Sequence, residues 1–114
     1  MTIETINIEK IQRRGKKAIR LLAFLEAKEG KDVELEKFLI SLVRPTVKEK
    51  GNLAYTPHRL KDNNEKFLVD EIWEDEESLD NHFKEPHMKG LTETLERLLA
   101  KPLELQIYKE ITIE

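Results

Sequence analysis

Between residues 17 and 27, apolar side chains recur at every second position, which is the pattern of a β-strand. One side of this strand carries Ile19, Leu21, Ala23 and Leu25. The other side also carries large apolar residues, Leu22 and Phe24, among polar ones. Because apolar area is costly to leave in water, we expect both faces of this strand to be covered.

Residues 32–47 change to a helical period, with apolar side chains three or four positions apart. The stripe consists of Leu35, Phe38, Leu39, Leu42, Val43 and Val47. Asp32 is the expected N-cap, because its carboxylate can accept a hydrogen bond from the first turn. Pro45 lacks a backbone N–H, so we expect a kink or an irregular turn around it, and Gly51 is expected to close the element.

Two further strands are predicted at residues 53–60 and 65–74. They are joined by residues 61–64, whose Asp-Asn-Asn composition favours a turn, so that the two strands form a β-hairpin.

A second helical region is expected to begin near Asp75, a plausible N-cap, and to be interrupted at Pro86. Its apolar residues are Leu79, Phe83, Met88, Leu91, Leu95, Leu98 and Leu99. Pro102 is expected to end it. Alternation returns over residues 103–111, which predicts a closing strand.

The predicted order, βαββαβ, is that of the ferredoxin-like α+β fold, an antiparallel sheet with helices on one face. Two helices cover only one face of such a sheet. Its other face would expose more apolar area than a monomer usually does. We therefore expect a homodimer in which the two sheets form a dimeric α+β barrel.

Residues 1–16 follow neither period and are interpreted as an N-terminal extension. An extra edge strand, an arm that reaches the partner subunit and a partly ordered tail are the alternatives. Residues 17–114 form one domain, since 114 residues suit a single globular unit.

Charge and composition exclude several classes of function. The formal net charge is −3 and is spread along the chain, so neither a nucleic-acid surface nor an acidic tail is expected. The chain has no cysteine, which excludes disulfides, thiolate metal sites and cysteine nucleophiles. The N-terminal segment has no apolar stretch typical of a signal peptide or membrane span, so we expect a cytoplasmic protein without membrane contact.

The candidate chemistry lies where the third strand meets the second helical region. Glu71 and Trp73 share one face of the strand, because they are two residues apart. A buried carboxylate there can act as a general base with a raised pKa, or accept a hydrogen bond from a neighbour. The alternative for Trp73 is a purely structural role in the core or an interface.

Two histidines follow on the helical region. His82 lies on its apolar side and is expected to turn toward the sheet, although a single such histidine is more often part of the core. His87 follows Pro86, which can redirect its ring toward the same space. Neutral imidazoles near pH 7 suit the deprotonation of a phenolic or enolic oxygen. Tyr55 and His58 alternate on the second strand, so at most one joins this side.

A metal site built from Glu71, His82 and His87 around iron or zinc is an alternative. The spacing matches no ligand motif known to us, so no metal is expected. Glycine-rich nucleotide-binding turns are also missing from the sequence. An oxidase of this kind would work without a cofactor.

The segments LVRPTVKEKGNLAYTPHR and FLVDEIWEDEESLDNHFKEPHMKGL resemble the antibiotic biosynthesis monooxygenase family, in particular its small quinol-monooxygenase-like bacterial members. The most specific pieces are Gly51 with Tyr55, the triplet at residues 71–73, and the run from Leu79 to Met88. The resemblance covers residues 17–111. It implies a dimeric ferredoxin-like barrel and a cofactor-independent enzyme that oxidises a quinol or polyphenolic aromatic molecule with dioxygen.

The resemblance also implies roles for the candidate residues. His82 or His87 would be the base, and Glu71 would orient it. Trp73 would stack on the substrate ring, Tyr55 would donate a hydrogen bond to a substrate oxygen, and Phe83 would line the pocket.

Other branches of the family imply other functions. Haem-degrading members carry an asparagine on the first strand, where this chain has Leu21, Ala23 and Leu25, which disfavours haem. A branch that isomerises a small phosphorylated sugar-like carbonyl compound resembles the stretch KEKGNL. A non-catalytic ligand-binding dimer is the remaining alternative, because a fold does not fix a function.

Overall fold

Strands and helices alternate along residues 17–111, the part of the chain that this computed structural model describes. The elements are β1 (Ile19–Glu26), α2 (Asp32–Val47), β2 (Asn52–Arg59), β3 (Lys66–Trp73), α3 (Glu76–His82), the short 3-10 helix η2 (Pro86–Met88), α4 (Leu91–Leu98) and β4 (Glu104–Lys109). This order confirms the predicted βαββαβ arrangement, with the second helical region divided into three pieces.

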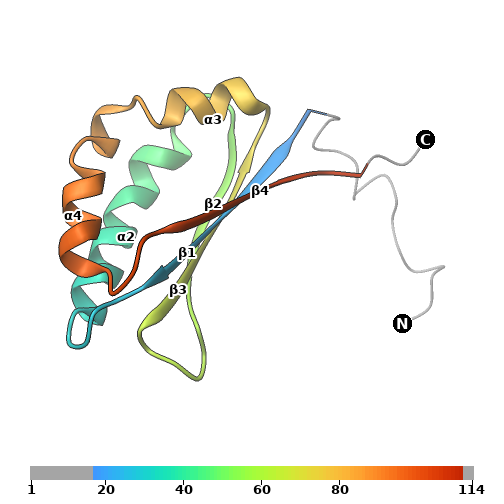
Figure 1. Cartoon of the computed structure of the whole chain (residues 1–114). Helices are drawn as coiled ribbons and strands as arrows, with labels where there is room; N and C mark the ends of the chain where they lie inside the picture. Colours follow the sequence, from blue (N-terminus) through green and yellow to red (C-terminus); the bar gives the residue numbers. More distant parts are fainter. Residues whose placement is uncertain (1–16, 112–114) are drawn as a thin grey trace, which may run out of the picture.

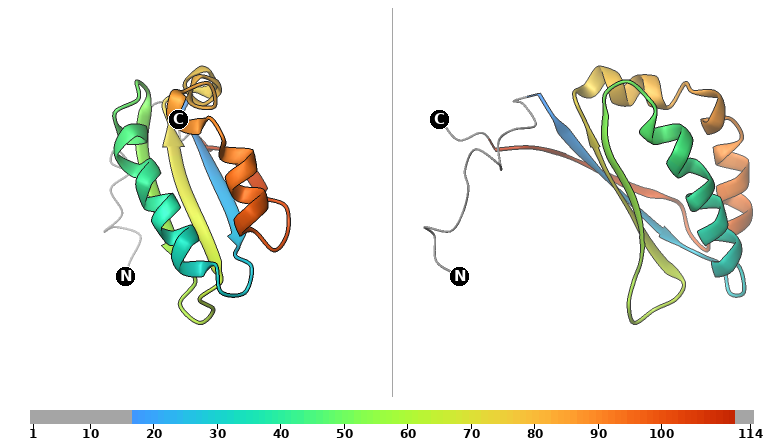
Figure 2. Two further views of the ribbon diagram at one scale, coloured as in Figure 1. Left: turned by 90° about the vertical axis from the view of Figure 1, so that its left-hand side faces the viewer. Right: turned by 180° about the vertical axis from the view of Figure 1, so that it is seen from behind.

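The four strands form one antiparallel sheet in the order β2-β3-β1-β4. Figures 1 and 2 show α2 and α4 on one face of this sheet, while α3 crosses one end of it. The other face carries none of the helices of residues 17–111. This is the ferredoxin-like α+β fold that the sequence predicts.

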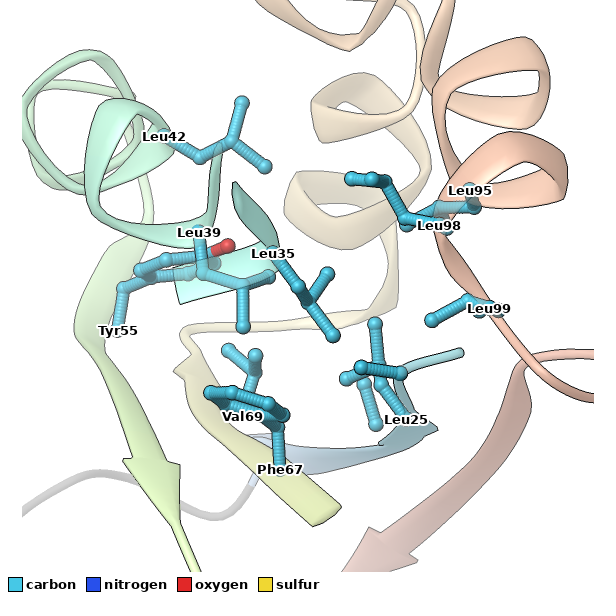
Figure 3. Packing of buried hydrophobic residues seen from close by; sticks show 12 residues of the cluster. Leu25, Leu35, Leu39, Leu42, Tyr55, Phe67, Val69, Leu95, Leu98 and Leu99 are labelled. Atoms are coloured by element: carbon cyan, nitrogen blue, oxygen red, sulfur yellow. The ribbon is translucent and has the colours of Figure 1, made fainter. Parts of the chain in front are cut away.

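The core lies between the sheet and the two longer helices. Alternate residues of β1 are buried on the helix side, in agreement with the period of two. They pack against leucines from α2 and α4 (Figure 3). The central members of this core are Leu25, Leu35, Leu39, Val69, Leu98 and Leu99. A second cluster, at the end of the sheet under α3, consists of Ile19, Leu21, Trp73 and Leu79.

The open face of the sheet carries half-buried apolar side chains. Phe24 and Leu68 lie directly opposite each other in the β1–β3 register, and Leu22 and Ile72 lie on the same face. Both faces are therefore apolar, as the sequence predicts.

Strand register determines which side chains meet on the helix side. Glu71 of β3 is paired with Tyr55 of β2 on one side and with Leu21 of β1 on the other. A register shift between Asn52 and Ala54 brings Tyr55 onto the helix side. The hairpin between β2 and β3 is confirmed, with the Asn63 side chain accepting a hydrogen bond from the Glu65 backbone N–H.

Some local predictions are wrong. Asp32 is not the N-cap of α2: Lys31 occupies that position, and the Asp32 carboxylate instead binds Arg59 at 3.1 Å. A charged partner is a stronger hydrogen-bond donor than a backbone N–H, which accounts for this choice. α2 continues through Pro45 to Val47, so the irregular turn is absent, and the alternative of a kink stays a prediction.

The second helical region begins at the predicted residue but ends earlier than predicted. Asp75 is confirmed as N-cap of α3, since its side chain accepts a hydrogen bond from the Ser78 N–H. α4 ends at Leu98, before Pro102, because residues 99 and 100 turn back to bond with the end of β1. The Ala100 N–H donates to Glu26, and Leu99 forms an isolated bridge with Ala27.

The N-terminal extension at residues 1–16 lies outside the described residues. Within residues 17–111, no helix has the length and apolar character needed to cross a membrane.

Candidate functional site

A single carboxylate oxygen holds two histidine rings at the end of the sheet where α3 lies. Glu49 Oε2 is 2.6 Å from His82 Nδ1 and 2.8 Å from His87 Nε2. The Glu49 and His82 side chains are only 6% and 2% exposed, whereas His87 is 18% exposed. Because a carboxylate only accepts hydrogen bonds, both imidazoles present an N–H to this oxygen. A buried ionisable group with two charge-assisted partners is well satisfied.

Glu49 is positioned by the turn that follows α2. Its backbone N–H donates to Thr46, and its carbonyl accepts from Asn52. Two residues later Gly51 has a positive φ of 90°, which favours glycine. A Cβ at Gly51 would overlap with the Ser78 side chain at the start of α3. This close approach of the turn to α3 brings Glu49 to the histidines.

The two histidines come from consecutive helical pieces. His82 is the last residue of α3, and Pro86 begins the 3-10 turn that carries His87. The chain turn between them places the ring centroids 5.8 Å apart. The predicted convergence of both rings is thus present. Thr46 Oγ1 lies 3.4 Å from His87 Nε2 and belongs to the same cluster.

Glu71 and Trp73 lie on the other side of His82. The Trp73 Nε1–H donates to Glu71 Oε1 at 3.0 Å, so the two residues share a face as predicted. Glu71 Oε1 is 3.9 Å from His82 Nε2, too far for a direct hydrogen bond. The structure therefore corrects the expected role of Glu71: the carboxylate in position to orient the histidine is Glu49.

Burial governs the protonation of the central groups. It raises the pKa of Glu71 to about 7. The hydrogen bond from Trp73 lowers this pKa, and the negative charge of Glu49 raises it further. Burial also lowers the pKa of His82, although its hydrogen bond to Glu49 opposes this. Burial raises the pKa of Tyr55, so its hydroxyl stays protonated. Near pH 7, His82 is neutral and Glu71 is close to its midpoint.

A small cavity of about 40 Å³ lies against this cluster. Its polar lining residues are Tyr55, Glu71 and His82, and Phe83 lies beside them. The rest of the lining is apolar and comes from β1, α2, β3, the η2 to α4 region, and the segment around β4. None of the described residues that line the cavity is a lysine or an arginine.

Four of the residues singled out from the sequence line this cavity, namely Tyr55, Glu71, His82 and Phe83. Trp73 does not: it is fully buried and packs on His82, with ring centroids 4.7 Å apart. The expected stacking of Trp73 on a substrate is therefore corrected to support of the His82 ring. His87 binds the same Glu49 oxygen as His82 and is also absent from the lining.

Sequence reasoning missed Glu49 and Thr46. Thr46 lies in the last turn of α2, and Glu49 follows the helix in a stretch rich in charged residues, where nothing distinguishes it from the other glutamates. Pro45 and Gly51 indicated a turn in this part of the sequence. Only the fold shows that this turn contacts α3. His58, the third histidine, is exposed on β2 and takes no part in the cluster.

Comparisons with known proteins identify the family and agree with the fold. The family model for the antibiotic biosynthesis monooxygenase matches residues 18–94. A conserved protein from Methanosarcina mazei has a solved structure that is 32% identical, with a TM-score of 0.80, covering 87% of this chain and 98% of that chain. Protein PA3566 from Pseudomonas aeruginosa is 26% identical, with a TM-score of 0.78, covering 84% of this chain and 96% of that chain.

A curated relative, the uncharacterized protein sll1783 from Synechocystis, is 31% identical over 85 residues, which are 75% of this chain. The match spans only 58% of that relative's length. The family model matches more than half of the chain, and the fold and the sequence motifs agree with it. The chain therefore belongs to the antibiotic biosynthesis monooxygenase family.

Proposed function

We propose that this protein is a cofactor-independent monooxygenase or oxidase that uses dioxygen to oxidise a quinol or another polyphenolic aromatic molecule. Family membership supports a monooxygenase-like function in general terms. The finer proposal rests on one observation, the buried His82 ring. Its Nδ1 is fixed by Glu49, and its Nε2 faces Glu71 beside the cavity.

This arrangement makes His82 the catalytic base. Donation of the Nδ1–H to Glu49 leaves the Nε2 lone pair free to accept a proton. The low pKa of His82, caused by burial, keeps the ring neutral near pH 7. When Nε2 takes the proton, the Glu49 carboxylate stabilises the imidazolium that forms, as the acid of a catalytic triad does.

The proposed reaction needs no electron carrier besides its two substrates. His82 removes the proton of a phenolic O–H, and the phenolate transfers one electron to dioxygen, giving an aryloxyl radical and superoxide. The two radicals combine at a ring C–H carbon, and the peroxide takes the proton back from His82. The O–O bond of this hydroperoxide then breaks, and the outer oxygen leaves as water together with the hydrogen of the ring carbon. The ring carbon becomes a carbonyl carbon. One oxygen atom of dioxygen enters the product.

The cavity is large enough for dioxygen but not for the aromatic substrate. A volume of about 40 Å³ accommodates a small molecule such as dioxygen, and its lining is largely apolar. Pockets for ring-sized ligands are roughly ten times larger. The aromatic substrate therefore approaches from the side of Phe83, whose side chain is 46% exposed and lies next to His82. Tyr55, protonated because burial raises its pKa, donates a hydrogen bond to the substrate oxygen.

The lining argues against the isomerase alternative. The phosphate of a sugar-like substrate is commonly bound by cationic side chains. The described residues around the cavity include none. A non-catalytic ligand-binding dimer keeps the same pocket and becomes an outcome of the test below.

We also propose that the protein works as a homodimer joined through the open face of its sheet. Apolar area there comes from Phe24, Leu68, Leu22 and Ile72, and none of the described helices covers this face. Burying this area between two copies is the simplest way to remove it from water.

Dioxygen uptake by metal-stripped protein tests the proposed function directly. The substrates are reduced naphthoquinols and anthrone-like phenols, and the spontaneous oxidation rate is subtracted. We expect uptake with at least one of them, and a loss of about 100- to 10,000-fold in the His82→Asn variant, as expected for removal of a general base.

The matched control is His58→Asn, which removes an exposed histidine outside the cluster. Both variants are first compared by thermal unfolding, so that a loss of activity is not a loss of fold. Uptake that survives in His82→Asn would refute the role of this base. No uptake with any substrate would favour the ligand-binding alternative.

A further inference from the structure

We infer that Glu49, His82 and His87 also form a binding site for a divalent transition-metal ion such as Zn²⁺. This inference does not depend on the proposed oxidation. One oxygen and two nitrogen atoms, one from each residue, all lie within 4.8 Å of one another. They come from three separate pieces of chain, the turn after α2, the end of α3 and η2. Two imidazoles and one carboxylate form a ligand set suited to zinc, nickel or iron.

Small movements convert the hydrogen-bonded cluster into a coordination site. Zinc binds nitrogen and oxygen at about 2.0–2.2 Å, so two ligand atoms of a tetrahedral ion are about 3.3 Å apart. Glu49 Oε2 is now 2.6 and 2.8 Å from the two nitrogens. The two N···O distances would have to increase by roughly 0.7 Å for His82 and roughly 0.5 Å for His87. His87 can provide this movement, because it lies on a short 3-10 turn and is the most exposed of the three.

Two neighbouring groups complete the site. Thr46 Oγ1, 3.4 Å from His87 Nε2, is close enough to hold a metal-bound water molecule or to approach the ion. Glu71 faces the other nitrogen of His82 at 3.9 Å. In metal sites a histidine ligand usually donates its second N–H to a carboxylate, and Glu71 would fill that role after approaching His82 by roughly 0.7 Å.

Metal binding and base catalysis exclude each other at His82. A neutral imidazole carries one proton, and His82 donates it from Nδ1 to Glu49 in a hydrogen bond. An ion on Nδ1 displaces this proton, and the neutral ring then carries its single proton on Nε2. Nε2 then has no lone pair for a substrate proton. Bound metal is therefore expected to inhibit the oxidation proposed above, which is why that reaction is assayed with metal-stripped protein.

Direct binding measurements on untagged, chelator-treated full-length protein test the site. Zn²⁺ binding is measured by titration calorimetry, and Co²⁺ binding by its visible absorption, which reports four-coordinate geometry. We expect one ion per chain. Glu49→Gln and His87→Ala should each weaken binding by at least about 100-fold, more than the loss typical of a group outside the ligand shell.

His58→Ala is the control, because it removes the one histidine outside the cluster. It should bind the ion as the unchanged protein does. Circular dichroism checks that each variant is folded, and His87→Gln replaces His87→Ala if the alanine variant is not. No binding at micromolar Zn²⁺, or binding that His58→Ala abolishes and His87→Ala preserves, would overturn the site.

Discussion

Glu49 and His82 are 33 residues apart in the sequence, yet Glu49 Oε2 and His82 Nδ1 are separated by only 2.6 Å. Both side chains are almost completely buried. Burying either one alone would be costly, because an unpaired carboxylate or imidazolium loses its hydration. The pair therefore fixes both the orientation of the His82 ring and the nitrogen that carries its proton.

Replacing Glu49 with glutamine tests this pairing. Glu49 opposes the burial that lowers the pKa of His82, so Glu49→Gln should lower that pKa further. The acidic limb of the rate profile should move to lower pH, because the neutral base then persists to lower pH. The rate should fall by about 10- to 100-fold, since a weaker base is a poorer catalyst.

The pKa of His82 is followed by NMR through its ring protons, with a chelator present. An exposed carboxylate on α4 provides the control variant, Glu96→Gln. An unchanged His82 titration in Glu49→Gln would contradict the assigned role of Glu49.

Glu71 should make the stability of the protein depend on pH. Its pKa rises from the ordinary value of 4.5 to about 7 on folding, so the folded protein binds the proton more tightly than the unfolded chain. The protonated Glu71 therefore contributes to the free energy of unfolding. This contribution is fully present below pH 4.5 and is lost as the pH rises through 7. The loss amounts to up to about 3 kcal/mol.

The Glu71→Gln variant has no such proton to lose. Urea unfolding at several pH values measures the free energy of unfolding of both proteins. As the pH rises from 4.5 to 8, this free energy should fall less in the variant than in the unchanged protein. Glu96→Gln again serves as the control and should follow the unchanged protein. Parallel stability curves for Glu71→Gln and the unchanged protein would show that Glu71 is not buried as described.

The fold was predictable because its signals are local. The period of two in β1 and the helical stripe of α2 each lie within a single element, and Asp75 caps the helix that directly follows it. Apolar residues on both faces of β1 follow from the same alternation. Such patterns depend on neighbouring residues in the sequence, so no knowledge of the tertiary structure is needed.

The site was predictable only in part. His82 and Glu71 could be found because a polar residue interrupts an apolar pattern. Glu49 interrupts nothing, since it lies in a turn where charged residues are ordinary. Its importance comes from the contact between that turn and α3. The misassigned helix cap at Asp32 has a similar cause, because its partner Arg59 is distant in sequence.

That contact between the turn and α3 depends on Gly51. Replacing it with alanine adds a Cβ that overlaps with Ser78, at a residue whose φ of 90° already disfavours a side chain. Gly51→Ala should lower the free energy of unfolding by about 2–4 kcal/mol, from backbone strain and the overlap together. Urea denaturation measures the change.

Gly30 offers a matched control. Its φ of 79° is similar, but nothing lies within 4 Å of an added Cβ. Gly30→Ala should therefore cost only the backbone strain, about 1 kcal/mol. In a Ser78→Gly background the cost of Gly51→Ala should fall toward that of Gly30→Ala. Equal costs for Gly30→Ala and Gly51→Ala in the unchanged background would show that the close approach to α3 is unimportant.

The proposed homodimer predicts that one charge on the open face separates the subunits. Phe24 lies opposite Leu68 in the centre of that face, so Phe24→Glu should give a monomer in sedimentation velocity. Ile40→Glu is the control, because Ile40 is 57% exposed on α2, on the other side of the sheet. A monomeric unchanged protein at micromolar concentration would disprove the dimer.

Phe83 should determine how well the aromatic substrate binds. Its ring lies 5.4 Å from that of His82 and borders the cavity, so a substrate placed for deprotonation would pack against it. Phe83→Ala removes an aromatic contact of about 0.5–1.5 kcal/mol, which corresponds to a KM about 2- to 10-fold higher. The value of kcat should change little, because this contact is the same in the ground state and the transition state. Leu60→Ala is the control, since Leu60 is similarly exposed, at 52%, and lies at the hairpin turn. A Phe83→Ala variant with an unchanged KM and a lower kcat would instead place Phe83 among the groups that act only in the transition state.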